Sequence, residues 1–196
     1  MKKLLLSLLI GFTCISLYAQ EETSYSSTFH SSIFQKDYAL MFVDRDLGSF
    51  LMEIINVEDI TNPVYLTFNR SDFQYFYNSL VKVKEKLVEW ERIAKKNKVT
   101  DYEKEIDVDF PAAIIVYKED GELISALTLL TPVFKANDWG YAVSFGGFGY
   151  STDLDHCIKY LFSFNQYDLN NFLKEINPKR VENNLAKKSR TDSLFK

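Results

Sequence analysis

The chain reads Tyr65-Leu66-Thr67-Phe68-Asn69-Arg70-Ser71-Asp72-Phe73 and, 96 residues later, Leu161-Phe162-Ser163-Phe164-Asn165-Gln166-Tyr167-Asp168-Leu169. Both stretches contain Phe-Asn-x-x-Asp, and the apolar positions around that motif match. The pattern predicts a strand that leaves a sheet, turns at an Asn and enters a helix. An Asp in the first helical turn would accept hydrogen bonds from free amides and complement the helix dipole. A unit of strands followed by a helix is therefore expected twice in this chain.

The residues after each junction have helical periodicity. After the first, apolar side chains recur every three or four residues at Phe73, Phe76, Leu80, Val83, Leu87, Trp90 and Ala94. This spacing predicts a long helix from Asp72 to about Lys96, with Ser71 and Gln74 as a capping box. The helix would lie across a sheet or, alternatively, form a coiled coil with a second chain. After the second junction, a short helix over Asp168 to Ile176 is expected to end before Pro178.

The remaining apolar stretches have strand length and turn residues between them. In the first half they are Tyr38 to Asp44, Phe50 to Val57 and Val64 to Asn69. In the second half they are Ala112 to Lys118, Glu122 to Phe134, Tyr141 to Phe145 and Lys159 to Asn165, and Asp120-Gly121 is a strong hairpin signal. The charged residues Asn97 to Asp109 are interpreted as a solvated connector. The sequence thus predicts an α+β fold of antiparallel sheets, with the long helix packed on a sheet.

The N-terminus has the pattern of an export signal. Lys2 and Lys3 precede an apolar run from Leu4 to Ile10, and Ala19 provides a small residue for cleavage. The run is too short for a transmembrane helix. We expect a signal peptide (1–19), a lead-in that is flexible or a weak strand (20–37), one α+β domain (38–177) with repeats at 38–97 and 108–177, and a basic, disordered tail (178–196). The protein would then be periplasmic or secreted, from a Gram-negative bacterium, with no transmembrane segment after cleavage.

Charge and cysteine content narrow the choice of partners. The formal net charge is −4, and loss of Lys2 and Lys3 with the signal would make it −6. A mildly acidic protein of this kind gains no electrostatic steering toward polyanions. Cys157 is the only cysteine outside the signal segment, so an intramolecular disulfide is not expected, and the thiol is interpreted as a buried small side chain.

One loop gathers residue types that bind metals. Asp153, Asp155 and His156 provide oxygen and nitrogen ligands for a divalent ion, or a site for a hydrolase. The same residues also suit a polar loop in which Asp side chains bond to their own backbone. The sequence contains no Gly-x-Ser-x-Gly elbow and no phosphate-binding loop, so no cofactor is predicted.

The strand at Tyr141 to Phe145 has one bulky and one nearly bare face. Tyr141, Val143 and Phe145 alternate with Ala142, Ser144 and Gly146. A bare face allows close approach by another part of the structure. Three features could account for the bare face: a helix of the same protein that packs on it, a ligand that binds there, or a bend of the strand at Gly146-Gly147.

The element order resembles the whirly or PUR-type repeat, in which four antiparallel strands and a helix pair with a second copy. The resemblance covers Tyr38 to Asn177, and the two strand-to-helix junctions are its specific residues. In that family the sheets bind single-stranded nucleic acid through aromatic and basic side chains, so it implies that role for Tyr141, Phe145 and Phe148. The export signal, the negative charge and strands poor in Lys and Arg argue against this ligand. The composition, rich in Asn, Lys, Tyr and Phe, is similar to that of exported Bacteroidetes proteins.

The function indicated first is a non-catalytic module that binds a protein, peptide or glycan. Aromatic residues make up 15% of the chain, more than one core of this size requires, and exposed aromatics favour recognition. The predicted binding surface consists of Trp139, Tyr141, Phe145 and Phe148. The alternatives are a hydrolase or metal-dependent enzyme at Asp153, Asp155 and His156, and a single-strand nucleic-acid binder. The oligomeric state is left open.

Overall fold

A computed structural model describes residues 23–44, 49–119, 122–138, 140–151 and 154–193. The first half of the chain forms β1 (Thr23–Ser31), β2 (Lys36–Asp44), β3 (Ser49–Asn56), β4 (Asp59–Asn69) and α2 (Arg70–Asn97). The second half forms β5 (Tyr102–Glu105), β6 (Ala113–Glu119), β7 (Glu122–Asn137), β8 (Gly140–Ser151), β9 (Leu154–Phe164), α3 (Gln166–Glu175) and α4 (Pro178–Ser193). Each half therefore runs through antiparallel strands into a helix, and the predicted α+β class is confirmed.

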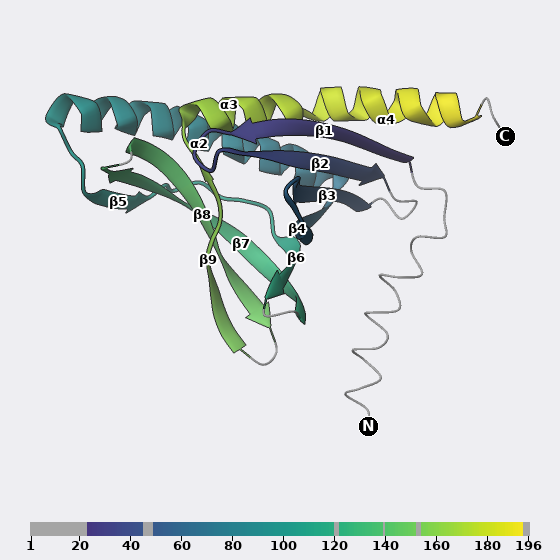
Figure 1. The fold of residues 1–196 in the computed structure, drawn as a ribbon, viewed down its shortest axis with the longest axis horizontal. Helices are drawn as coiled ribbons and strands as arrows, with labels where there is room; N and C mark the ends of the chain where they lie inside the picture. Colours follow the sequence, from purple (N-terminus) through teal and green to yellow (C-terminus); the bar gives the residue numbers. More distant parts are fainter. Residues whose placement is uncertain (1–22, 45–48, 120–121, 139, 152–153, 194–196) are drawn as a thin grey trace.

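The strands pair in the order β1-β2-β3-β4-β6-β7-β8-β9, and β5 adds to β7. The two four-stranded halves, β1–β4 and β6–β9, are joined where β4 pairs with β6 over three residue pairs, Tyr65 with Val116 through Thr67 with Ile114. Figure 1 shows the two halves diverging below the helices. Because the junction is short, the halves can turn toward each other and enclose a common core.

The long helix α2 lies on the inner face of both halves. Its apolar stripe is buried, and the Phe73 ring lies 4.5 Å from Phe50 and 6.2 Å from Phe42 and Phe68. Farther along, Trp90 packs edge-on to Phe134 of β7. Burial of large apolar side chains at this spacing is the main stabilising contribution to such a helix. The predicted packing of this long helix on a sheet is confirmed.

The two junctions of the repeated motif differ in detail. At the second, the Asn165 side chain accepts a hydrogen bond from the Asp168 amide at 2.8 Å, as an N-cap does. At the first, Asn69 is the N-cap residue but makes no capping bond, and its amide donates to the Asp72 carboxylate at 3.3 Å. The predicted capping box is wrong, because Ser71 already lies inside the helix and Gln74 bonds Asn78 instead.

Three polar segments are more ordered than their sequences indicate. The lead-in forms the full strand β1, which pairs with β2 along its whole length and buries Phe29 and Ser31. The basic tail forms α4 up to Ser193 rather than a disordered end, because Val181 and Leu185 are buried and the helix contacts β1. The charged connector contains β5 and buries Ile106 and Phe110, which stabilises it against the core.

The strand with one bare face is β8. Its bulky side chains Val143 and Phe145 are 0% and 1% exposed and belong to the core. The pairing of β8 with β9 shifts register between Phe145 and Gly147, where the sequence allowed a bend as one alternative. Ala142 and Ser144, on the bare face, line an open cleft.

Candidate functional site

The cleft depends on a buried carboxylate that fixes the turn between β1 and β2. Asp168, in the first turn of α3, is 0% exposed. Its carboxylate accepts hydrogen bonds from the Ser31 hydroxyl at 3.0 Å, the Ser32 amide at 2.7 Å and the Ile33 amide at 3.1 Å. A buried charge is stable where several donors satisfy it, and a helix N-terminus adds a favourable field. Asp168 therefore stabilises a distant turn rather than the first amides of its own helix.

Further bonds complete this clamp on the turn. The Asn165 amide donates to the Ser32 hydroxyl at 2.7 Å, while the Phe34 amide donates to the Ser31 hydroxyl at 3.3 Å. Gln35 has a φ of 52°, in the left-handed region, which allows the chain to reverse into β2. The nearby Tyr38 hydroxyl has a raised pKa, because it is partly buried and because the Asp168 charge opposes its ionisation.

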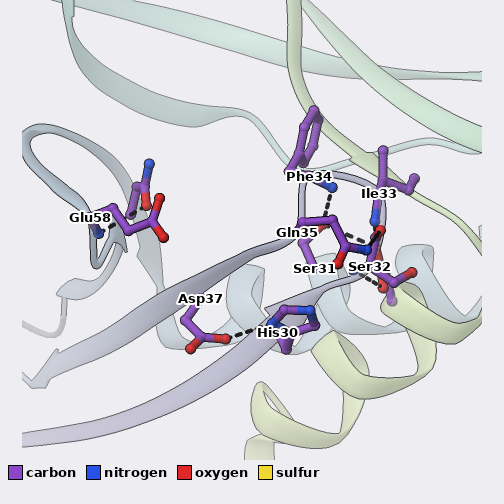
Figure 2. Close-up of polar contacts among 10 residues, drawn as sticks. His30, Ser31, Ser32, Ile33, Phe34, Gln35, Asp37 and Glu58 are labelled. Atoms are coloured by element: carbon purple, nitrogen blue, oxygen red, sulfur yellow. Dashed lines mark hydrogen bonds and ion pairs between the residues drawn. The ribbon is translucent and has the colours of Figure 1, made fainter.

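The clamped turn presents two apolar side chains to solvent. Ile33 is 38% exposed and Phe34 is 47% exposed. Figure 2 shows both side chains on one side of the turn, with the His30 and Asp37 pair on the other. Large apolar groups held at the surface by buried hydrogen bonds have little freedom to lose when a ligand binds.

Ile33 and Phe34 line an open cleft of about 800 Å³. The other lining residues come from β8 (Gly140, Tyr141, Ala142, Ser144), β7 (Lys135, Asn137), β9 (Ser163), the N-cap of α3 (Asn165), α3 itself (Gln166, Tyr167, Asn170) and α2 (Glu91, Lys95). The volume lies in the range typical of ligand-binding pockets. Five helices and strands and the β1–β2 turn thus converge on one hollow.

Tyr141 lies partly buried in the lining of this cleft. Its ring stacks on Phe134 at 6.4 Å, and its hydroxyl donates to the Val99 carbonyl at 3.4 Å. The Lys95 ammonium lies 5.6 Å from the centre of the ring, within range for a cation–π contact. By contrast Tyr167, on the first turn of α3, is 62% exposed.

The charged groups of the cleft are already paired. The Lys95 ammonium lies 2.5 Å from Glu91, and the Lys135 ammonium lies 2.9 Å from Glu103 of β5. The Glu91 carboxylate raises the pKa of Lys95 through this bond. Gln166 and Asn170 make no side-chain hydrogen bond within the described part of the chain. The cleft therefore offers amides and aromatic rings rather than uncompensated charge.

The predicted binding surface is only partly brought together. Tyr141 lines the cleft, but Phe145 is in the core, because it lies on the face of β8 that packs against Phe110 and Phe164. Trp139 and the Phe148 side chain lie outside the described residues. Sequence reasoning missed Ile33, Phe34 and Tyr167. The sequence signal for Ile33 and Phe34 was the presence of two adjacent apolar residues in a Ser-rich turn.

The structure does not describe the side chains of the predicted metal or hydrolase site. Asp153 lies outside the described residues, as do the side chains of Asp155 and His156, whose backbone is in β9. Among the described residues no three His, Cys, Asp or Glu side chains gather as metal ligands.

Two hydrogen-bonded side-chain pairs contain residue types that enzymes use in catalysis. Figure 2 shows His30 bonded to Asp37 at 2.7 Å, with both side chains more than half exposed. The Ser144 and Ser163 hydroxyls in the cleft bond to each other at 2.8 Å. A nucleophile needs a base within hydrogen-bond reach, and neither described pair combines the two.

Within the described ranges, no helix has the length and apolarity needed to cross a bilayer. Comparison of the chain with models of protein families, with curated proteins and with solved structures finds no match.

Proposed function

We propose that this protein is a non-catalytic glycan-binding module and that its ligand lies in the cleft beside the β1–β2 turn. The observation that carries this proposal is the convergence of Phe34 from the β1–β2 turn, Tyr141 from β8 and Tyr167 from α3 on one open hollow that amide and hydroxyl side chains also line. Phe34 and Tyr167 are 47% and 62% exposed and are therefore accessible to a ligand.

The chemistry of the lining suits a sugar. A sugar ring has apolar C–H faces and a rim of hydroxyls. Aromatic side chains provide flat apolar surface, and the Tyr hydroxyl adds a polar end. The amides of Gln166 and Asn170 can each donate and accept hydrogen bonds, as ligand hydroxyls require. Lys95 and Lys135 are already paired with Glu91 and Glu103. An uncharged ligand that makes no bond to these lysines therefore leaves no ammonium group without a partner.

A binding role is also favoured over hydrolysis at this place. The two cleft serines bond to each other, and Glu91 is engaged by Lys95. No described group in the lining is thus poised as a base beside a nucleophile. We further propose that binding occurs outside the cytosol, on the strength of the signal-peptide pattern in residues 1–19.

A glycan array tests the proposal. Tyr167→Ala and Phe34→Ala should each weaken binding to the glycans retained by the parent protein by about tenfold, the usual loss for an exposed aromatic that anchors a ligand. Tyr75→Ala is the matched control, because Tyr75 is 41% exposed on α2 and does not line the cleft. Both cleft rings are exposed, so thermal unfolding should change little.

Two results would contradict the proposal. One is a parent protein that retains no glycan. The other is an equal loss of binding in Tyr75→Ala and in the cleft variants. Preferential retention of an unfolded or extended peptide, lost in Tyr167→Ala, would replace glycan by peptide as the ligand class.

A further inference from the structure

A second hollow lies beside the cleft, among the three helices. This helical groove has a volume of about 530 Å³ and is lined by Tyr77, Val81 and Lys84 of α2, Asn170, Leu173 and Lys174 of α3, Asn177, and Arg180 of α4. Asn177 ties the helices together, because its amide donates to the Tyr77 hydroxyl at 3.2 Å and its carbonyl oxygen accepts from the Arg180 backbone amide.

The helical groove carries uncompensated positive charge. Arg180 is paired with Glu175 at 2.7 Å. Lys84 and Lys174 have neither an ion pair nor a side-chain hydrogen bond with any described residue. Two ammonium groups and a guanidinium thus share one hollow that one carboxylate only partly neutralises. Like charges held together without counter-charges favour binding of an anion.

The excess positive charge extends over the helices. The sequence of α2 contains seven Lys or Arg against four Asp or Glu, and that of α4 contains five against two, whereas α3 between them contains one against two. The whole chain nevertheless has a net charge of −4. Figure 1 shows α2, α3 and α4 along one side of the molecule, so the cations are concentrated there while the acids lie mainly elsewhere. The helical side is therefore the part of the surface with a field that attracts acids.

The helical groove and the cleft are adjacent. Asn170 lines both, so the two hollows meet at one side chain of α3. A ligand of several units that lies in the cleft would reach the helical groove past Asn170. The aromatic part of this combined track would take ring faces, and the cationic part would take acidic substituents.

We infer that the ligand is an acidic polysaccharide, with neutral ring faces in the cleft and carboxylates on Lys84, Lys174 and Arg180 in the helical groove. This inference rests on the proposed function for the cleft and names its ligand class. A single-stranded nucleic acid also combines rings with anions, but it carries a phosphate at every unit and requires positive charge along the whole track. The paired lysines of the cleft do not provide this, whereas a uronic-acid polymer with its rings in the cleft needs cations at fewer places.

The experiment compares each acidic oligosaccharide with its own neutral form. Oligogalacturonate and oligomannuronate are titrated calorimetrically beside the same oligomers after reduction of their carboxyl groups. The acidic form should bind about tenfold more tightly at low salt, as expected for one or two charge-assisted hydrogen bonds, and the difference should shrink as salt is added. Oligothymidylate and polyglutamate serve as competing anions.

Two double variants locate the effect. Lys84→Gln with Lys174→Gln should remove the preference for the acidic form and leave binding of the reduced form unchanged. Lys82→Gln with Lys96→Gln removes the same charge from exposed positions of α2 outside the helical groove and should leave the preference intact.

The outcomes separate the two proposals. Equal binding of acidic and reduced forms, or an unchanged preference in Lys84→Gln with Lys174→Gln, overturns the inference while Tyr167→Ala still reports on the cleft. Tighter binding of oligothymidylate or polyglutamate than of either oligouronate also overturns it. Binding of the acidic oligosaccharide that depends on Lys84 and Lys174 but not on Tyr167 would support the role inferred for the helical groove. It would contradict the role proposed for the cleft.

Discussion

Asp168 and Asp72 occupy matching places in the repeated motif but have different surroundings. Both lie in the first turn of a helix, 96 residues apart. Asp168 is 0% exposed and accepts three hydrogen bonds from the β1–β2 turn, whereas Asp72 accepts one from Asn69 near the surface. The same residue type at the same helical position thus contributes a clamp in one half and a surface contact in the other.

Removal of the buried carboxylate should therefore be costly. Asp168→Ala leaves the Ser32 and Ile33 amides without acceptors and should lower the free energy of unfolding by about 3 kcal/mol. Asp72→Ala is the matched control and should cost less than about 1 kcal/mol. Urea unfolding of both variants measures the difference. Equal losses would show that the clamp adds nothing beyond a first-turn acid.

We expect the ionisation of Glu53 to lower the stability of the protein as the pH rises. Burial raises its pKa above 4.5, and a hydrogen bond from Tyr65 offsets part of the rise. A carboxyl group whose pKa is higher in the folded state than in the unfolded state stabilises the protein at pH values below its unfolded-state pKa. This contribution is lost as the pH rises through its folded-state pKa. Glu53→Gln should therefore increase stability at pH 7, with a smaller increase at pH 4.

Unfolding of this variant in urea at the two pH values measures that change. Glu58→Gln is the control, because Glu58 is exposed and follows β3. A Glu53→Gln effect of the same size at pH 4 and pH 7 would contradict the assignment of the effect to ionisation.

At the scale of elements, apolar periodicity decides what the sequence can predict. The helix α2 was predictable because its buried stripe repeats over six turns, and β2 to β4 were predictable because they are rich in Phe, Ile and Val. Strand β1 was predicted only as an alternative to a flexible segment, and helix α4 was missed, because they bury few large side chains, Phe29 in one and Val181 and Leu185 in the other. The regular structure of β1 and α4 is stabilised by tertiary contacts, and the periodicity of apolar residues does not reveal such contacts.

The same limit applies to the site. The strand pattern of Tyr141, Val143 and Phe145 predicted one bulky face correctly, but alternation does not say which face points inward. Phe145 was therefore assigned to the surface although it lies in the core. Phe34 and Tyr167 line the same cleft, and the turn that carries Phe34 is held by Asp168 through hydrogen bonds that span more than 130 residues, which alternation does not reveal.

Helix α4 should contribute measurably to stability. Leu185 is 6% exposed on the helix face that contacts β1, so Leu185→Ala should cost about 2–4 kcal/mol through lost burial and a cavity. Lys187→Ala, on the exposed face, should change stability by less than about 0.5 kcal/mol. Denaturant unfolding provides both values. A Leu185→Ala protein as stable as its parent would mean that α4 is not docked in solution.

At the scale of the whole molecule, the two halves form one core around α2. Aligned apolar positions are buried in both copies: Phe68 and Phe164, Phe73 and Leu169, Phe76 and Phe172, Leu80 and Ile176. The shared order of strands and helix agrees with the repeated motif. A common origin of the halves, and kinship with whirly or PUR-type repeats, stay predictions.

The contact between Ser31 and Asp168 also sets an order of events during folding. It closes a loop of 137 residues, and contacts this distant in sequence are slow to form because much chain entropy is lost before they are made. Local hairpins such as β1–β2 can form early, yet their turn stays without its carboxylate until α3 has been synthesised and docked. We therefore expect an emerging chain to lack the clamped turn, so that the cleft proposed as the binding site takes shape only after α3 has joined the rest of the fold.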